Sequence, residues 1–198
     1  MSRIDDLIAD QCPGGVDHRM LGEIAHYSRE RVSADSLDES SFVGVENLLA
    51  DKGGKVPASY SPNSAMVTSY IVGDVLIGNI RPYLKKIWLA DNAGGCSGDV
   101  LAVRRSIDFE DRIEPRFLYY VLSSDAFFSY NMQHAKGAKM PRGSKEAILK
   151  YRIPVPPLEV QREIVRVLDL FQSLEAELEA ELEARQRQFI HFLRVLMT

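Results

Sequence analysis

The chain has 198 residues, of which 45% are hydrophobic and 26% are charged, a composition typical of globular proteins in water. This length accommodates one domain of ordinary size with an appendage. No window approaches the roughly 18 consecutive apolar residues of a membrane span, and the charged residues 1–6 lack the apolar core of a signal peptide. Cys12 and Cys96 belong to no CxxC pair, so the sequence predicts free thiols in a cytoplasmic protein.

The net charge of −4 is unevenly distributed along the chain. Residues 1–77 carry 6 basic and 12 acidic side chains, residues 78–157 carry 13 and 8, and residues 158–198 carry 5 and 8. Their net charges are therefore −6, +5 and −3. Because salt screens each charge beyond about 8 Å, DNA responds to the local field of one face. The basic central segment is thus a candidate phosphate-binding surface.

Short helical and extended patterns alternate in the first part of the chain. Helical spacing over residues 4–10 ends before the breaker cluster 12–15. Short strands are predicted at residues 42–45, 67–72, 75–80, 86–89 and 100–103. Gly73-Asp74 predicts a hairpin turn between two of them, and the glycine-rich residues 92–98 predict another turn.

Helical periodicity returns at Pro115, a residue suited to the first turn of a helix. Apolar residues then share one helical face, namely Phe117, Leu118, Val121, Leu122 and Phe128. A short helix is predicted over 144–149, where Ser144 gives an imperfect capping signal. We therefore predict an α+β fold, in which a globular domain over 1–157 contains a twisted mixed β-sheet with flanking helices.

Residues 158–198 predict one long coiled-coil helix that follows a proline-rich strap at 154–157. Its apolar residues recur in steps of three and four, and 41 residues at 1.5 Å each give a rod of about 60 Å. Such a rod outruns a domain of about 150 residues, so we predict a spacer and dimerisation element. Its predicted pairing residues are Phe171, Leu174, Leu178, Leu182, Phe189 and Leu193. The alternative is a long helix packed on its own domain.

The sequence predicts no catalytic, metal or cofactor site in this chain. Residues 94–99 lack the G-x-S-x-G spacing of a nucleophile elbow, and residues 52–55 lack the pattern of a P-loop. Residues 79–83 differ by an inserted Arg from the Asn/Asp-Pro-Pro-Tyr/Phe signature of amino-methyltransferases. No metal-ligand spacing occurs among the histidines His18, His26, His134 and His191.

Two basic clusters are candidates for contact with DNA. One covers residues 81–86, and the other covers 134–145, where glycines would let backbone N–H groups approach phosphates. The predicted DNA contacts are Arg81, Lys85, Lys86, Lys136, Lys139, Arg142 and Lys145. Arg142 is the candidate base reader, because arginine can grip guanine O6 and N7, and the lysines are candidate phosphate contacts. The alternative is a solvated basic surface loop.

Several motifs resemble the specificity (S) subunit of Type I restriction–modification systems. The proline strap with the helix start at 153–161 and the Arg-x-x-Gln-Tyr/Phe motif at 185–189 form the most specific pair. Further similar segments are 5–16, 21–24, 78–86, 97–101, 164–165, 168–169 and 192–194. The resemblance implies target recognition domains that bind double-stranded DNA and are held apart by long antiparallel helices.

The same resemblance implies a non-catalytic subunit. Modification (M) subunits that carry S-adenosylmethionine would methylate adenine, and a restriction (R) subunit would cleave DNA with ATP and Mg²⁺. A usual S subunit has two recognition domains, whereas this chain has the motifs of one. It is therefore either a half-subunit that dimerises or a fragment, and we predict a homodimer on an interrupted palindrome. The competing interpretation is a coiled-coil scaffold or adaptor whose basic domain binds nucleic acid without sequence specificity.

Overall fold

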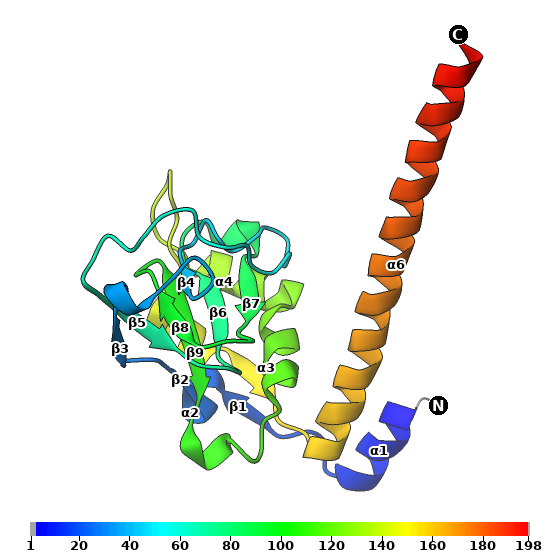
Figure 1. The fold of residues 1–198 in the computed structure, drawn as a ribbon. Helices are drawn as coiled ribbons and strands as arrows, with labels where there is room; N and C mark the ends of the chain where they lie inside the picture. The colour runs from blue at the N-terminus through cyan, green and yellow to red at the C-terminus, as the bar shows by residue number, and fades with distance from the viewer. Residues whose placement is uncertain (1–2, 198) are drawn as a thin grey trace.

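The computed structural model describes residues 3–197 as a globular domain from which one long helix extends (Figure 1). The helices are α1 (Arg3–Gln11), α2 (Leu21–Ile24), α3 (Pro115–Leu122), α4 (Asp125–Gln133), α5 (Lys145–Lys150) and α6 (Leu158–Leu196). The 3-10 helices are η1 (Ala34–Ser36), η2 (Pro82–Leu84) and η3 (Ile107–Phe109). The strands are β1 (His18–Met20), β2 (Ala25–Tyr27), β3 (Arg31–Ser33), β4 (Phe42–Val43), β5 (Met66–Tyr70), β6 (Val75–Gly78), β7 (Ile87–Leu89), β8 (Gly94–Cys96), β9 (Val100–Arg105) and β10 (Arg152–Pro154).

The strands form two four-stranded sheets and one two-stranded ribbon. The central sheet has the order β2-β9-β6-β7, and the outer sheet has the order β3-β5-β8-β4. The pair β4–β8 is parallel, whereas the other strand pairs are antiparallel. The predicted α+β class is therefore confirmed. The strands expected from the sequence are divided between the two four-stranded sheets, and the β1–β10 ribbon was not predicted.

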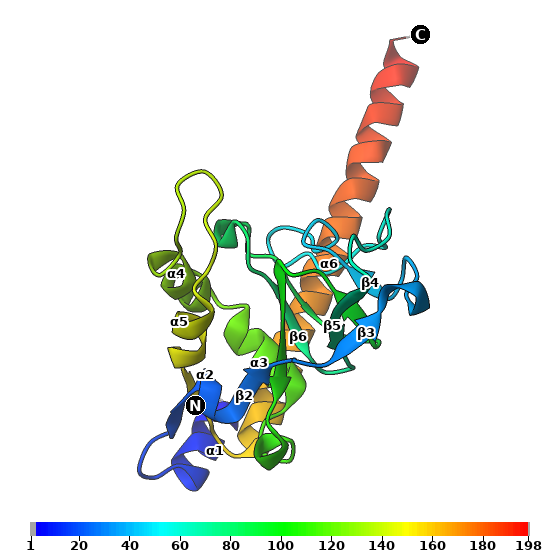
Figure 2. The ribbon, with the colours of Figure 1, turned by 90° about the vertical axis from the view of Figure 1, so that its left-hand side faces the viewer.

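The central sheet is buried on both faces because successive side chains of a strand point in opposite directions. Val75 and Ile77 of β6 belong to a core with side chains of α2, α3, α4 and α5. Leu76, between them, belongs to a second core with Val43 and Tyr70 of the outer sheet. The domain thus has three layers, with helices on one face of the central sheet and the outer sheet on the other (Figure 2).

The predicted hairpin around Gly73-Asp74 is wrong, because β5 and β6 lie in different sheets. Asp74 is 2% exposed, and its carboxylate accepts a hydrogen bond from the Ile71 amide (3.0 Å) and forms an ion pair with Arg104 (2.9 Å). These contacts hold the tight turn while the chain crosses between the layers. The partners of β6 are β7 and β9.

The glycine-rich segment predicted as a turn contains strand β8. This strand pairs with β5 on one side and with β4 on the other. A Cβ atom on Gly94 would lie 2.0 Å from the carbonyl oxygen of Ser41, so close backbone packing requires glycine here. A glycine-rich segment is compatible both with a turn and with a closely packed strand, and the local sequence pattern does not distinguish the two.

The predicted helices are present, although the run from Pro115 is divided into α3 and α4. Ser124 ends this first run and caps α4, since its hydroxyl accepts a hydrogen bond from the Phe127 amide (3.2 Å). Ser144 caps α5 in the same way by accepting from the Ala147 amide (3.3 Å). Among the helices of residues 3–197, none has the length and hydropathy needed to cross a membrane.

The base of α6 is joined to the domain by a buried glutamine. The Gln161 side chain is fully buried, and its Nε2 donates to the carbonyls of Pro156 (2.7 Å) and Arg112 (2.8 Å). Its Oε1 accepts from the Glu114 amide (2.9 Å). One turn beyond the strap, the helix is therefore fixed both to its own start and to the segment that precedes α3.

The burial of β6 predicts a large difference between two isoleucines. Ile77→Ala removes a side chain with no exposure and should lower the free energy of unfolding by about 2–5 kcal/mol. Ile107→Ala is the matched control, because Ile107 is 81% exposed and its loss should change stability by less than about 0.5 kcal/mol. Urea unfolding followed by circular dichroism measures both, and equal effects would contradict the two-faced core.

Candidate nucleic-acid interface

The two basic loops predicted from the sequence lie side by side at the end of strand β6. The Arg81 amide donates to the Pro141 carbonyl (2.7 Å), and the Gly143 amide donates to the Asn79 carbonyl (3.0 Å). Ile80 and Arg142 also form an isolated β-bridge. Segments separated by some 60 residues of sequence therefore make one surface, and Figure 2 shows the second loop projecting beyond α4 and α5.

We call this surface the basic edge. It comprises the seven predicted contacts and one lysine that sequence reasoning missed, namely Lys52, Arg81, Lys85, Lys86, Lys136, Lys139, Arg142 and Lys145. Lys52 comes close because the amides of Asp51 and Lys52 donate to the carbonyls of Leu84 (2.9 Å) and Lys85 (3.1 Å). Its sequence signal was the 51–54 turn, which alone does not show where the turn docks.

The basic edge contains side chains that are held by contacts with the domain and side chains that are exposed and form no salt bridge within residues 3–197. Lys85 forms an ion pair with Asp125 (2.9 Å), and Arg142 forms one with Asp99 (3.0 Å). Lys86 is turned inward, where its Nζ donates to the Val45 carbonyl (2.8 Å). By contrast, Lys136 and Lys139 are exposed and take part in none of the salt bridges of residues 3–197.

Ion pairing at the basic edge shifts the pKa of one carboxyl group and of one guanidinium. Hydrogen bonds from Lys85 and then Lys52 lower the pKa of the Asp125 carboxyl. The hydrogen bond with Asp99 raises the pKa of the Arg142 guanidinium above its ordinary value. Asp99 and Asp125 were not predicted from the sequence, because each lies about 40 residues from its basic partner.

The first loop of the basic edge has unusual backbone geometry. Arg81 and Lys85 flank η2 with φ angles of 52° and 49°, and Asp51 and Lys52 also have positive φ. Such angles are uncommon outside glycine and persist where surrounding contacts hold them. Here the backbone hydrogen bonds to Pro141 and to the 51–52 turn hold η2 from both sides. The basic side chains consequently project from a rigid turn.

The root of the second loop requires glycine at position 143. A Cβ atom there would lie 2.3 Å from Asn131 Oδ1 and 2.9 Å from Asn79 Oδ1. Both asparagines are buried, with exposures of 1% and 5%. Gly143 therefore allows the base of the loop to pack closely against these two asparagines. The sequence analysis had explained the loop glycines by close approach to phosphates.

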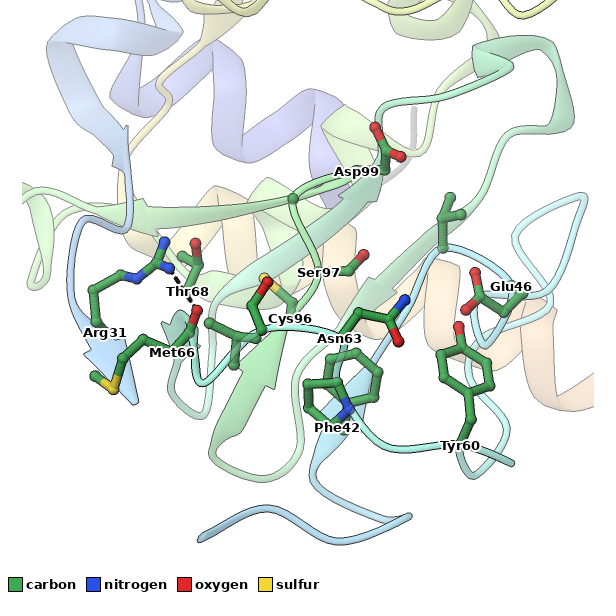
Figure 3. Close-up of a pocket in the computed structure, with 15 residues that line it drawn as sticks. Arg31, Phe42, Glu46, Tyr60, Asn63, Met66, Thr68, Cys96, Ser97 and Asp99 are labelled. Carbon is green, nitrogen blue, oxygen red and sulfur yellow. Dashed lines mark hydrogen bonds between the residues drawn. The ribbon is translucent and has the colours of Figure 1, made fainter. Parts of the chain in front are cut away.

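A pocket of about 400 Å³ lies beside this surface, between the outer sheet and residues 60–64 (Figure 3). Asp99 lies at one end, and Phe42 and Tyr60 lie toward the other. Burial raises the pKa of the Cys96 thiol, which lines this pocket, to about 12, so the thiol stays protonated near neutral pH. Its lining contains no histidine that could activate Ser97.

The pairing residues predicted on α6 are exposed along one side of the rod. Arg116 and Tyr120 of α3 contact Asp169, with an Arg116 Nε to Asp169 Oδ1 distance of 2.6 Å. Beyond this contact, the helix extends away from the domain (Figure 1). The exposed apolar positions include Phe171, Leu174, Leu178, Leu182, Phe189 and Leu193. Within residues 3–197, no cluster of three or more His, Cys, Asp or Glu side chains could hold a metal ion.

Comparison with known proteins gives one consistent family. The Type I restriction modification DNA specificity domain matches residues 89–184. The chain is 28% identical over 97 residues to the Type I restriction enzyme EcoDI specificity subunit of Escherichia coli. It is 29% identical over 159 residues to a putative type I restriction enzyme specificity subunit, S.HindORF215P, of Haemophilus influenzae. These matches cover 49% and 80% of this chain.

The HsdS subunit from Thermoanaerobacter tengcongensis has a similar crystal structure, with a TM-score of 0.64 and 26% identity over 84% of this chain. The specificity-domain match, the two curated relatives and this crystal structure all indicate similarity to type I specificity subunits. It spans 20% and 32% of the two curated relatives and 44% of the HsdS chain. The fold and the family resemblance predicted from the sequence are therefore confirmed.

The type I specificity domain match includes the second loop of the basic edge and much of α6. The first loop, residues 81–86, precedes the matched segment and is tied to it by the hydrogen bonds described above. The roles of the individual basic residues toward DNA stay predictions.

Lys139 provides a test of the basic edge. Lys139→Ala should weaken binding to all duplex sequences alike and reduce the slope of log K against log salt by about 0.9, because one phosphate contact is lost. Lys150→Ala, at the far end of α5, is the charge-matched control and should leave the slope unchanged. Fluorescence anisotropy from 50 to 200 mM salt measures both slopes. Identical behaviour of the two variants would exclude Lys139 from the interface.

Proposed function

We propose that this chain is the sequence-specific DNA-binding component of a type I restriction–modification complex. It directs adenine N6 methylation by a modification subunit, and cleavage by a restriction subunit where one is present. The observation that carries the proposal is the basic edge, a rigid surface built from two distant loops, in a chain similar to type I specificity subunits. This chain supplies recognition, while S-adenosylmethionine, ATP and Mg²⁺ belong to the partner subunits.

The charge of the basic edge supports double-stranded DNA as its ligand. Residues 78–157 carry a net charge of +5 within a chain of net charge −4. Exposed lysines such as Lys136 and Lys139 suit phosphates, which accept a point charge from many directions. The fixed guanidinium of Arg142 suits a base edge, where the donor must hold one orientation. Both kinds of contact are needed for recognition of sequence.

We further propose that two copies of the chain pair through α6 in antiparallel orientation on an interrupted palindrome. Leu178, Leu182 and Phe189 lie seven, eleven and eighteen residues after Phe171, close to whole numbers of helical turns, so they form one stripe. The exposure of these four side chains is between 57% and 66%. An unpaired apolar stripe of this kind on a rod fits a second helix better than it fits water.

Charges along α6 favour antiparallel over parallel pairing. Five glutamates occupy residues 175–183 without an intervening base, whereas Arg185, Arg187 and Arg194 follow without an intervening acid. Antiparallel helices place the acidic stretch of one copy against the basic end of the other, and parallel helices place like charges together. With Phe171 opposite Leu196, Leu178 would face Phe189, and the two-fold axis would pass near residues 183 and 184.

A substitution in the stripe tests the pairing. Leu178→Asp would bury a carboxylate in the helix pair and should convert dimers into monomers at micromolar concentration. Ala180→Asp is the matched control, since position 180 faces away from the stripe and should leave the dimer intact. Light scattering gives the mass of each protein. A parent chain that is monomeric with and without DNA would overturn the homodimer.

The function itself is tested by methylation in cells. The chain is co-expressed with the modification subunit encoded beside its gene, and N6-methyladenine is mapped across the genome. We expect methylation at an interrupted palindrome. An interrupted asymmetric site would support specificity function with a different second half, whereas absence of sequence-specific methylation by an assembled complex would overturn the proposal.

A further inference from the structure

Arg142 and Asp99 meet in a side-on contact that leaves one end of the guanidinium available. Arg142 Nε lies 3.0 Å from Asp99 Oδ1, and Arg142 Nη2 lies 3.4 Å from Asp99 Oδ2. Nε and one hydrogen of Nη2 point at the carboxylate, so Nη1 and the other Nη2 hydrogen point away from it. This outer pair has the spacing of a two-pronged donor, and the Arg142 side chain is 56% exposed.

The backbone fixes both partners of this contact. Arg142 exchanges two hydrogen bonds of 2.9 Å with Lys136 across the loop. The Asn79 amide donates to the Asp99 carbonyl (2.8 Å), and the Asn79 carbonyl accepts from the Gly143 amide (3.0 Å). Asn79 thus joins the turn that carries Asp99 to the residue after Arg142. The guanidinium therefore has little freedom left to lose when it meets a ligand.

The carboxylate of Asp99 opposes the general charge of the surface. An acidic group at a phosphate-binding face lowers the attraction for DNA of any sequence. Asp99 therefore contributes orientation in place of affinity. Guanine matches this orientation, since its O6 and N7 in the major groove accept two parallel hydrogen bonds from the end of an arginine.

We propose that Asp99 is a positioning residue that holds Arg142 end-on to read a guanine in the major groove. The pair then specifies one G·C position in each half of the recognition site. This inference rests on the proposed function, and it adds the base class that is read and the residue that orients its reader. An ordinary surface salt bridge that only stiffens the loop would instead affect binding to all sequences equally.

The test is selection of bound duplexes from a randomised library by the complex of the full chain with its modification subunit. The parent should enrich a motif that contains a guanine at one position controlled by Arg142. Arg142→Ala should reduce preference for that guanine by about 5- to 150-fold, the range for loss of a bidentate base contact. Asp99→Asn should reduce preference at the same position by at least about fivefold and leave the remainder of the motif.

A binding measurement on Asp99→Asn and three further variants distinguish a positioning role of Asp99 from a general structural role. Asp99→Asn should bind random duplex at low salt as tightly as the parent or more tightly, because a negative charge is removed. Arg142→Lys keeps the charge without the fork and should lose the same position. The double variant Asp99→Asn/Arg142→Ala should discriminate no less than Arg142→Ala alone. Asp108→Asn, an exposed acid in η3, is the charge control and should keep the full motif.

Distinct outcomes would overturn the inference. They are an unchanged motif for Asp99→Asn, effects of Asp99→Asn and Arg142→Ala at different positions, or a uniform loss of affinity with no change of motif. Thermal unfolding of each variant within a few degrees of the parent shows that the fold is kept. A parent complex that enriches no motif would overturn the proposed function first, and this inference with it.

Discussion

Burial of strand β6 on both of its faces is the constraint on which the rest of the domain depends. Its four residues have no free side, because helices cover one face and the outer sheet covers the other. The chain leaves this strand at Asn79 and enters the η2 turn immediately. Arg81 and the loop bonded to it are therefore anchored directly to a strand that is buried on both faces. A loosely packed core would leave the position of the basic edge less well defined.

Elements with a local cause were predictable from the sequence, and those with a distant cause were not. The periodicity of α3 and α6 is set by residues three and four apart, so it can be read locally. The position of β8 depends on β4 and β5, and its glycines give the same local signal in a strand as in a turn. Asp74 likewise looked like a turn residue, whereas its partner Arg104 lies 30 residues away in the central sheet.

The candidate interface shows the same division. Its lysine and arginine residues could be predicted from the sequence, because they lie close together along the chain in two clusters. Their acidic partners were not visible, because Asp99 and Asp125 reach Arg142 and Lys85 only through the fold. Lys86 shows the limit of such a prediction. It belongs to a basic cluster of the sequence, but its side chain is directed inward and donates to the Val45 carbonyl. The charge pattern thus indicated which residues form the basic edge. Only the fold shows which of their side chains are ion-paired, directed inward or exposed.

The hydrogen bonds of Gln161 at the base of α6 have a mechanical consequence. The helix extends from the Gln161 contact to Leu196, 35 residues further along the chain, which is about 50 Å at 1.5 Å per residue. A tilt of about 5° at this base would displace the far end by about 4 Å. A small change at one buried amide would thereby become a large sideways displacement at the far end of the helix. The three hydrogen bonds of Gln161 therefore help to set the direction in which α6 leaves the domain.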